Sequence, residues 1–182
     1  PSIAMGHEVT VTALQMLNAI NAIANDGRRM RPSIVSRVVT PGGETVYENK
    51  PEIVSRPIRA RTARLMRTLM ARVTDEGGTG RRARVAGYDV GGKTGTAQKV
   101  IDGRYSDDAN IASFVGFLPV EKPELSLIVV VDDPQPVRTG GRVAAPAFSD
   151  VASQAIRYLE AGADPASRVV RRQERNPDRQ GS

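Results

Sequence analysis

The clearest pattern of apolar and polar positions lies near the start of the chain, in "VTVTALQMLNAINAIANDG". Its apolar residues recur three or four positions apart, the spacing of one helical face; they are Leu14, Leu17, Ile20 and Ala24. Thr12 followed by Gln15 matches the capping box that begins many helices, and Gly27 suits the left-handed position that ends one. A helix is therefore expected between Thr12 and Gly27.

The same spacing predicts two more helices. The first runs from about residue 61 to 74, with an apolar face and several arginines turned outward. The second opens at Pro146, because proline is favoured in the first helical turn, and closes at Gly162. Its apolar stripe consists of Phe148, Val151, Ala152, Ala155, Ile156 and Leu159.

β-branched runs predict strands in two parts of the chain. Residues 32–49 hold two such runs around "PGG", typical of a hairpin, whereas residues 50–58 contain two prolines and are expected to be a loop. Three strands follow at 88–100, 111–118 and 125–131. The turns between these three are too short for a parallel crossover, so the strands must pair antiparallel. The predicted fold class is α+β, an antiparallel sheet with helices packed on its faces.

The composition is that of an ordinary globular chain. Its 182 residues, 40% of them hydrophobic, suffice for one domain with its own core. We expect this domain over residues 1–162 and a disordered basic tail over residues 163–182. Apolar runs are too short for a membrane span, and no signal peptide is visible. Because the first residue is Pro1 and not Met, we expect the chain to be a piece of a longer protein.

The net charge of +6 owes much to arginines in residues 59–72 and in the tail. Proteins that bind single-stranded nucleic acid place aromatic residues between such charges, so that bases can stack on them. No aromatic residue lies among the arginines of these two segments. We interpret the arginines as a solvated helix face and a loose tail, and expect no nucleic-acid partner. The absence of cysteine excludes disulfides and thiolate metal sites. The single histidine, His7, is expected to be structural.

One motif suggests nucleotide binding. The phosphate-loop pattern G-x-x-x-x-G-K-[ST] is matched by Gly87, Gly92, Lys93 and Thr94. Asp132 and Asp133 follow an apolar run, as a metal-holding aspartate would. A phosphate loop, however, joins a buried strand to a helix N-terminus. Here "TGRRARVA" precedes the motif, and Gly95 and β-branched Thr96 follow it, which favours a strand. Nucleotide binding is kept as an alternative, and both aspartates are expected to form a strand-end turn.

The segment "KTGTAQ", followed by "IASFVGFLP" and "LSLIVVVDDP", resembles the third active-site motif of the penicillin-binding transpeptidases. Three other segments resemble parts of the same family in the same order: "VTVTALQMLNAINAIANDG", "DEGGTGRRARVAGYDVGG" and "GGRVAAPAFSDVASQAIRYL". The resemblance covers roughly residues 2–159 and is to the class B type, the cell-division and elongation D,D-transpeptidases of peptidoglycan. It implies an incomplete fold of the serine β-lactamase and penicillin-binding transpeptidase type.

The resemblance also implies roles for single residues. The family transfers acyl groups through a serine ester, on stem peptides that end in D-Ala-D-Ala, and β-lactams react with the same serine. Lys93 would supply positive charge near the terminal carboxylate, and Thr94, Gly95 and Thr96 would bind substrate. The backbone N–H of Thr96 would be one of two oxyanion-hole donors. Strand side chains alternate, so the two threonines should share one face and the lysine the other. Residues 76–80 and Arg82 either rim this site or form a surface connector.

The chain departs from the family in two motifs. No serine is followed by lysine three residues later, as the nucleophile of S-x-x-K would be, and S-x-N is absent; its nearest string is "SDD" at Ser106. We therefore expect the C-terminal portion of a transpeptidase domain, with one wall of the site, no nucleophile and no activity by itself. A non-catalytic scaffold with the same fold is the other alternative.

The family resemblance further implies partners and location. The expected ligands are stem peptides and β-lactam antibiotics, and the expected protein partners are membrane proteins of the division or elongation machinery. No metal or organic cofactor is implied. The protein would work on the periplasmic or extracytoplasmic face of the bacterial cell membrane, anchored by a segment upstream of this chain.

Overall fold

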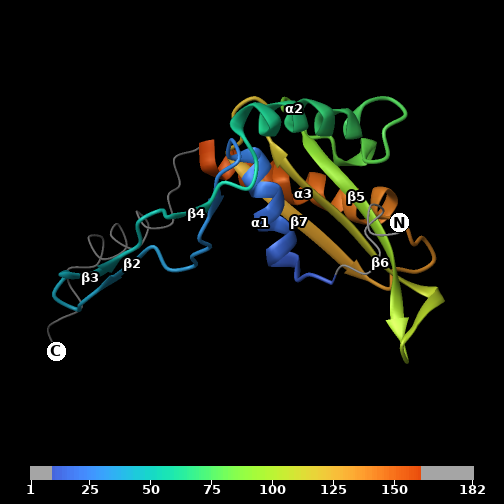
Figure 1. Cartoon of the computed structure of the whole chain (residues 1–182), viewed down its shortest axis with the longest axis horizontal. Coiled ribbons are helices and arrows are strands. Elements are labelled where there is room, and N and C mark those ends of the chain that lie inside the picture. Colours follow the sequence, from blue (N-terminus) through green and yellow to red (C-terminus); the bar gives the residue numbers. More distant parts are fainter. Residues whose placement is uncertain (1–9, 161–182) are drawn as a thin grey trace, which may run out of the picture.

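The main body of the molecule is a three-stranded antiparallel sheet with helices on its faces (Figure 1). The computed structural model describes residues 10–160. The sheet consists of β5 (Gly91–Ile101), β6 (Arg104–Leu118) and β7 (Leu125–Asp132), in the order β5-β6-β7. The helices are α1 (Ala13–Ala24), α2 (Ala60–Ala71) and α3 (Gly140–Glu160), with short 3-10 turns η2 (Arg72–Thr74) and η3 (Arg81–Ala83). The predicted α+β class with an antiparallel sheet is confirmed.

Alternation along β6 assigns the helices to opposite faces of the sheet. Phe114 faces α3, where its ring meets that of Phe148 edge-on with centroids 4.7 Å apart. Phe117 has the opposite parity and is paired with Ser126, whose hydroxyl donates to the Asn21 side-chain oxygen of α1 at 3.2 Å. The sheet is therefore covered by α3 on one face and approached by α1 on the other.

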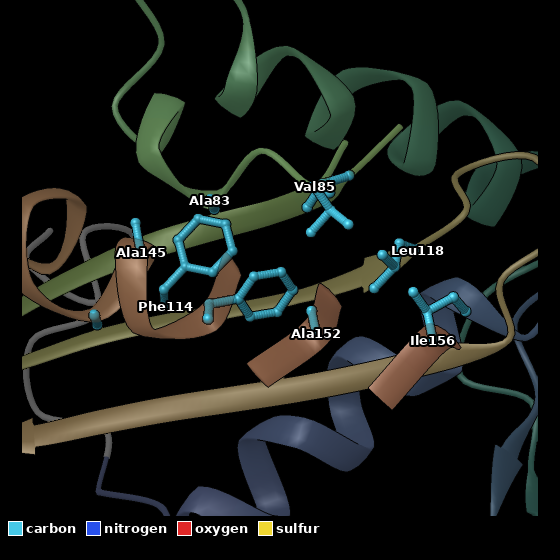
Figure 2. Close-up of a cluster of buried hydrophobic side chains, with 10 residues drawn as sticks. Ala83, Val85, Phe114, Leu118, Ala145, Ala152 and Ile156 are labelled. Atoms are coloured by element: carbon cyan, nitrogen blue, oxygen red, sulfur yellow. The ribbon is translucent and has the colours of Figure 1, made fainter. Parts of the chain in front are cut away.

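The core lies between β6 and α3 (Figure 2). Phe114, Phe148 and Leu118 are fully buried there. Small residues of α3 let the helix approach the sheet closely; Ala144, Ala145 and Ala152 are all fully buried. Ala83 and Val85, which follow residues 76–80, pack against the same cluster. The core thus fixes α3 and the 76–85 segment relative to β5 and β6.

The helix predicted between Thr12 and Gly27 is confirmed as α1, including its capping box. The backbone N–H of Gln15 donates to the Thr12 hydroxyl at 3.2 Å, and the Thr12 N–H donates to the Gln15 side chain at 2.8 Å. Gly27 has the expected left-handed backbone, with φ of 81°. The helix predicted at 61–74 is confirmed as α2 and its continuation η2.

Two small ribbons form an arm that extends away from the body (Figure 1). β2 (Arg37–Val39) and β3 (Thr45–Glu48) form the hairpin predicted around "PGG". The loop predicted at 50–58 is wrong, because β4 (Ile53–Ser55) pairs antiparallel with β1 (Arg29–Met30). The β-branched pair Ile53–Val54 lies between the two prolines, Pro51 and Pro57, so the prolines bound the strand and do not interrupt it.

Three predicted boundaries are also wrong. α3 begins at Gly140, six residues before Pro146, which lies inside the helix. β6 begins at residue 104 and not 111, because it continues the hairpin across the Asp102–Gly103 turn. β5 begins at Gly91 and not at 88; Tyr88 forms only an isolated bridge with Val85. His7, Gly162 and the predicted tail at 163–182 lie outside the described residues.

Within residues 10–160, no helix is both long and apolar enough to cross a bilayer.

Candidate active site

The K-T-G-T run lies in the first half of β5, an edge strand of the sheet. Lys93, Thr94, Gly95 and Thr96 pair in antiparallel register with residues 112–115 of β6. The strand continues to Ile101, so no helix follows Thr94. A phosphate loop needs a helix N-terminus at this point to direct its amides at the phosphates. The extended backbone therefore excludes a phosphate loop at this motif.

The hydroxyls of Thr94 and Thr96 lie on the α3 face of β5. The Thr94 hydroxyl donates to the Thr79 hydroxyl at 3.1 Å, and the Thr96 hydroxyl accepts from the backbone N–H of Gly140 at 3.2 Å. Both side chains line the same cavity. The prediction that the two threonines share a face is confirmed, and each hydroxyl is held by a neighbouring segment.

The first turn of α3 approaches β5 so closely that only glycine fits. A Cβ on Gly140 would overlap the carbonyl oxygens of Ser113 and Gly95, and a Cβ on Gly141 would overlap the carbonyl oxygen of Thr79. These obstacles are backbone atoms, which cannot rotate away. The Gly-Gly pair therefore brings the α3 N-terminus, the 76–80 loop and β5 to one place.

The cavity at this junction has a volume of about 450 Å³. Its lining residues are Gly78, Thr79, Arg81, Arg82, Thr94, Thr96, Thr139, Gly141 and Arg142. Of the two alternatives for residues 76–80 and Arg82, a rim of the site and a surface connector, this lining favours the rim. The contributions of Thr139 and Arg142 were not predicted, although the neighbouring Gly-Gly pair was a signal of close approach.

Lys93 does not line this cavity. Its side chain is exposed, and its ammonium donates to the carbonyl oxygen of Thr94 at 2.7 Å. By strand alternation the lysine belongs to the face opposite the two threonines. The positive charges that line the cavity therefore belong to Arg81, Arg82 and Arg142.

Packing against β6 explains why β5 carries glycine at two positions. A Cβ on Gly92 would lie 2.7 Å from the Phe114 ring, and a Cβ on Gly95 would overlap the Ser113 hydroxyl. Side chains of β6 thus occupy the space that these glycines leave. Close approach of a ligand backbone, which the sequence suggested, remains a prediction.

Asp132 and Asp133 lie at the end of β7, as expected for a strand-end turn. Asp132 forms an ion pair with Lys99 at 2.9 Å, and this contact raises the pKa of Lys99. Asp133 adopts a left-handed backbone with φ of 47°. Among residues 10–160, no group of three or more His, Asp or Glu side chains could hold a metal ion.

Comparison with known proteins assigns the family. The family model described as the penicillin-binding protein transpeptidase domain matches residues 1–153. The chain therefore belongs to the penicillin-binding protein transpeptidase family, and the resemblance seen in the sequence is confirmed.

Individual relatives agree with this assignment. The probable peptidoglycan D,D-transpeptidase PenA of Neisseria flavescens is 35% identical over 159 residues, covering 87% of this chain and 37% of that protein. Stage V sporulation protein D of Bacillus subtilis is 39% identical over 158 residues, covering 86% and 24%. Penicillin-binding protein 3 of Mycobacterium tuberculosis, complexed with aztreonam, superposes with a TM-score of 0.78 at 33% identity, covering 87% and 37%. The chain thus spans between about a quarter and little more than a third of the length of these proteins.

Proposed function

We propose that this chain carries one wall of the active site of a peptidoglycan D,D-transpeptidase. The observation that supports this most is the K-T-G-T run, extended on edge strand β5 with Thr94 and Thr96 facing a cavity of about 450 Å³. An edge strand offers unpaired backbone N–H and C=O groups, and an extended peptide can add to it as a further strand. The substrate is a stem peptide ending in D-Ala-D-Ala.

The reaction in this proposal is acyl transfer through a serine ester. The serine oxygen attacks the carbonyl carbon of the penultimate D-Ala, and the terminal D-Ala leaves as the amine with the serine proton. An amine of a second stem peptide then displaces the serine and forms the cross-link. The Thr96 backbone N–H donates to the oxyanion, and such a donor is worth about 10²–10³ in rate. Thr94 and Gly95 position the substrate, and Lys93 contributes positive charge at the strand.

The serine of this proposal lies outside these 182 residues, because S-x-x-K is absent from the sequence. The isolated chain is then inactive, and the whole protein is the enzyme. It works on the extracytoplasmic face of the cell membrane, anchored by an upstream segment and accompanied by membrane proteins of division or elongation. β-Lactams are its inhibitors, an assignment supported by the aztreonam complex of the Mycobacterium tuberculosis relative.

Fluorescent penicillin tests this proposal. Cells that express the gene are treated with the reagent, and labelled bands are digested with trypsin and analysed by mass spectrometry. A labelled band is expected to contain the tryptic peptide of residues 105–138, whereas the purified 182-residue chain takes up no label. Absence of that peptide from every labelled band, with the protein present in the cells, would favour a non-catalytic scaffold. Covalent labelling of the purified chain would reveal a nucleophile within it.

A further inference from the structure

The cavity beside Thr94 and Thr96 has a marked excess of positive charge. Arg81, Arg82 and Arg142 line it, and none of its lining residues is acidic. The guanidinium of Arg81 lies 4.0 Å from the Glu76 carboxylate, which is a long distance for an ion pair, and the Glu76 side chain is 89% exposed. Glu76 therefore neutralises the charge of Arg81 only weakly. Within residues 10–160, neither Arg82 nor Arg142 has an ion-pair or side-chain hydrogen-bond partner. Two guanidinium groups are therefore available to a ligand.

These two arginines stand on elements that the core holds rigidly. Arg82 belongs to η3 and directly precedes Ala83, which is fully buried in the core cluster. Arg142 belongs to the first turn of α3, which is fixed against β5 and the 76–80 loop by the Gly140–Gly141 contacts. Ser149 of α3 also donates to the carbonyl oxygen of Arg84, tying the helix to the segment that carries Arg82. Binding groups on rigid elements keep their geometry before the ligand arrives.

The remaining polar groups of the cavity also suit an anion. Thr79, Thr96 and Thr139 supply hydroxyls that can donate to an oxygen acceptor, and the Thr94 hydroxyl can do so by turning from Thr79 to the ligand. The N-terminus of the 21-residue helix α3 adds a partial positive charge at the same wall. Guanidinium groups pair with carboxylates through two parallel N–H···O bonds, which gives both strength and orientation. Lys93 is not among the residues that line the cavity, so the charge of the lining itself comes from arginines.

We propose that Arg82 and Arg142 bind the terminal carboxylate of the peptide substrate, together with the hydroxyls of Thr94 and Thr96. This inference rests on the proposed function, and it assigns the carboxylate-binding charge to two arginines on η3 and α3. Ligands of this cavity must then carry a negatively charged end. The substrate peptide should therefore bind poorly when its terminal carboxylate is converted to an amide. Arg82 and Arg142 are substrate-binding residues in this scheme and take no part in bond making.

The test is an NMR titration of the full 182-residue chain, labelled with ¹⁵N. The probes are diacetyl-L-Lys-D-Ala-D-Ala and the same peptide as its C-terminal amide, in which a neutral carboxamide replaces the negative carboxylate. Arg82→Gln and Arg142→Gln remove one guanidinium each. Arg61→Gln is the matched control, because Arg61 is an exposed arginine of α2 that does not line the cavity and has no ion pair among residues 10–160. Unchanged urea midpoints verify that each variant is folded.

The carboxylate peptide is expected to bind about tenfold more tightly than the amidated peptide. Its binding should change the NMR chemical shifts of the backbone N–H groups of Thr79, Thr94 and Gly141. Arg82→Gln and Arg142→Gln should each lower the affinity for the carboxylate peptide by about three- to tenfold. The variant that carries both substitutions should bind the carboxylate peptide and the amide equally, and Arg61→Gln should bind as the wild type does.

The outcomes separate this inference from the proposed function. Binding of the carboxylate peptide that is unchanged in Arg82→Gln and Arg142→Gln would overturn the arginine assignment and leave the transpeptidase proposal intact. Arginine-dependent binding of acetate at the cavity, without binding of the peptide, would support an anion site and count against the transpeptidase substrate. Absence of binding by both the peptide and acetate would overturn the inference, because two unpaired arginines that bind no carboxylate cannot form this site.

Discussion

The body and the arm of this molecule use similar residues with opposite results. In the body, apolar side chains of β6 and α3 are enclosed, and Phe114 and Phe148 are fully buried. In the arm, every residue of β2 and β3 is exposed, including Val46 at 66% and Tyr47 at 48%. Both regions contain antiparallel strands with β-branched and aromatic residues. Strand propensity alone therefore does not decide where stability resides; burial against a second layer does.

This difference bears on function because the candidate site is built on the body. The core that buries Phe114 also fixes the α3 N-terminus and the 76–80 loop beside Thr94 and Thr96. Disturbing the body should therefore alter stability and the site together. Disturbing the arm should leave both almost unchanged.

The largest effect is expected from truncating the central aromatic residue. Phe114→Ala removes a fully buried ring and leaves a cavity against Phe148, which should lower the free energy of unfolding by about 3–5 kcal/mol. The matched change in the arm, Val46→Ala, should cost less than about 1 kcal/mol. Urea denaturation followed by circular dichroism measures both. Equal losses would show that the arm has a core of its own.

The next effect comes from adding one methyl group at each of two glycines. Gly141→Ala places a Cβ against the carbonyl oxygen of Thr79, and the required backbone shift should cost about 1–3 kcal/mol. Gly42→Ala in the arm has only the Thr40 hydroxyl at 3.8 Å and should change stability by less than about 0.5 kcal/mol. The same unfolding assay applies. A neutral Gly141→Ala would mean that α3 and the 76–80 loop are not held together as described.

A smaller, pH-dependent effect is expected where α1 meets α2. The Arg67 guanidinium, almost fully buried, donates to Asp26 at 2.8 Å and lowers the pKa of that carboxyl. A lowered folded-state pKa adds stability above the unfolded value of about 3.9, and this stability is lost as the pH falls through the folded value. The wild type should therefore exceed Asp26→Asn in stability at pH 7, and the gap should close below about pH 4. A gap independent of pH would contradict this origin.

The smallest effect is expected for the ion pair of the arm. Arg31 and Glu52 are 2.6 Å apart, but their side chains are 63% and 54% exposed. The Arg31 guanidinium lowers the pKa of Glu52, so this pair too should weaken in acid. Because solvent and salt screen exposed charges, Glu52→Gln should change the urea midpoint less than Asp26→Asn, and the change should vanish in about 1 M NaCl. A larger change than at Asp26 would reverse the comparison between arm and body.

The sequence predicted those features whose signals are local. The capping box of Thr12 and Gln15 specified the start of α1, and the turn residues specified the order and direction of β5, β6 and β7. Features set by tertiary contact were missed. Pro146 suggested a helix start because proline is favoured there, but packing of Gly140 and Gly141 on β5 extends the helix six residues further. β4 was missed because its partner β1 lies more than twenty residues away.

The candidate site was predictable from the sequence mainly along β5. The K-T-G-T run and its alternation were visible in the sequence, and Arg82, beside the 76–80 loop, was one of the residues left open between a rim of the site and a surface connector. Arg142 and Thr139 lie more than forty residues beyond that run. Only the fold of α3 against the sheet brings them to the cavity, so no pattern within β5 could reveal them.

Lys93 and the strand that carries it are proposed to form part of a penicillin-reactive site. The most direct measurement is the rate at which fluorescent penicillin labels the whole gene product in its native membranes, for Lys93→Ala and for Lys99→Ala at equal abundance. Lys99 is the matched control, because it lies on the same strand and pairs with Asp132 away from the cavity. We expect Lys93→Ala to slow labelling by about a hundredfold or more, and Lys99→Ala to be labelled as fast as the wild type. Wild-type labelling by Lys93→Ala would contradict it.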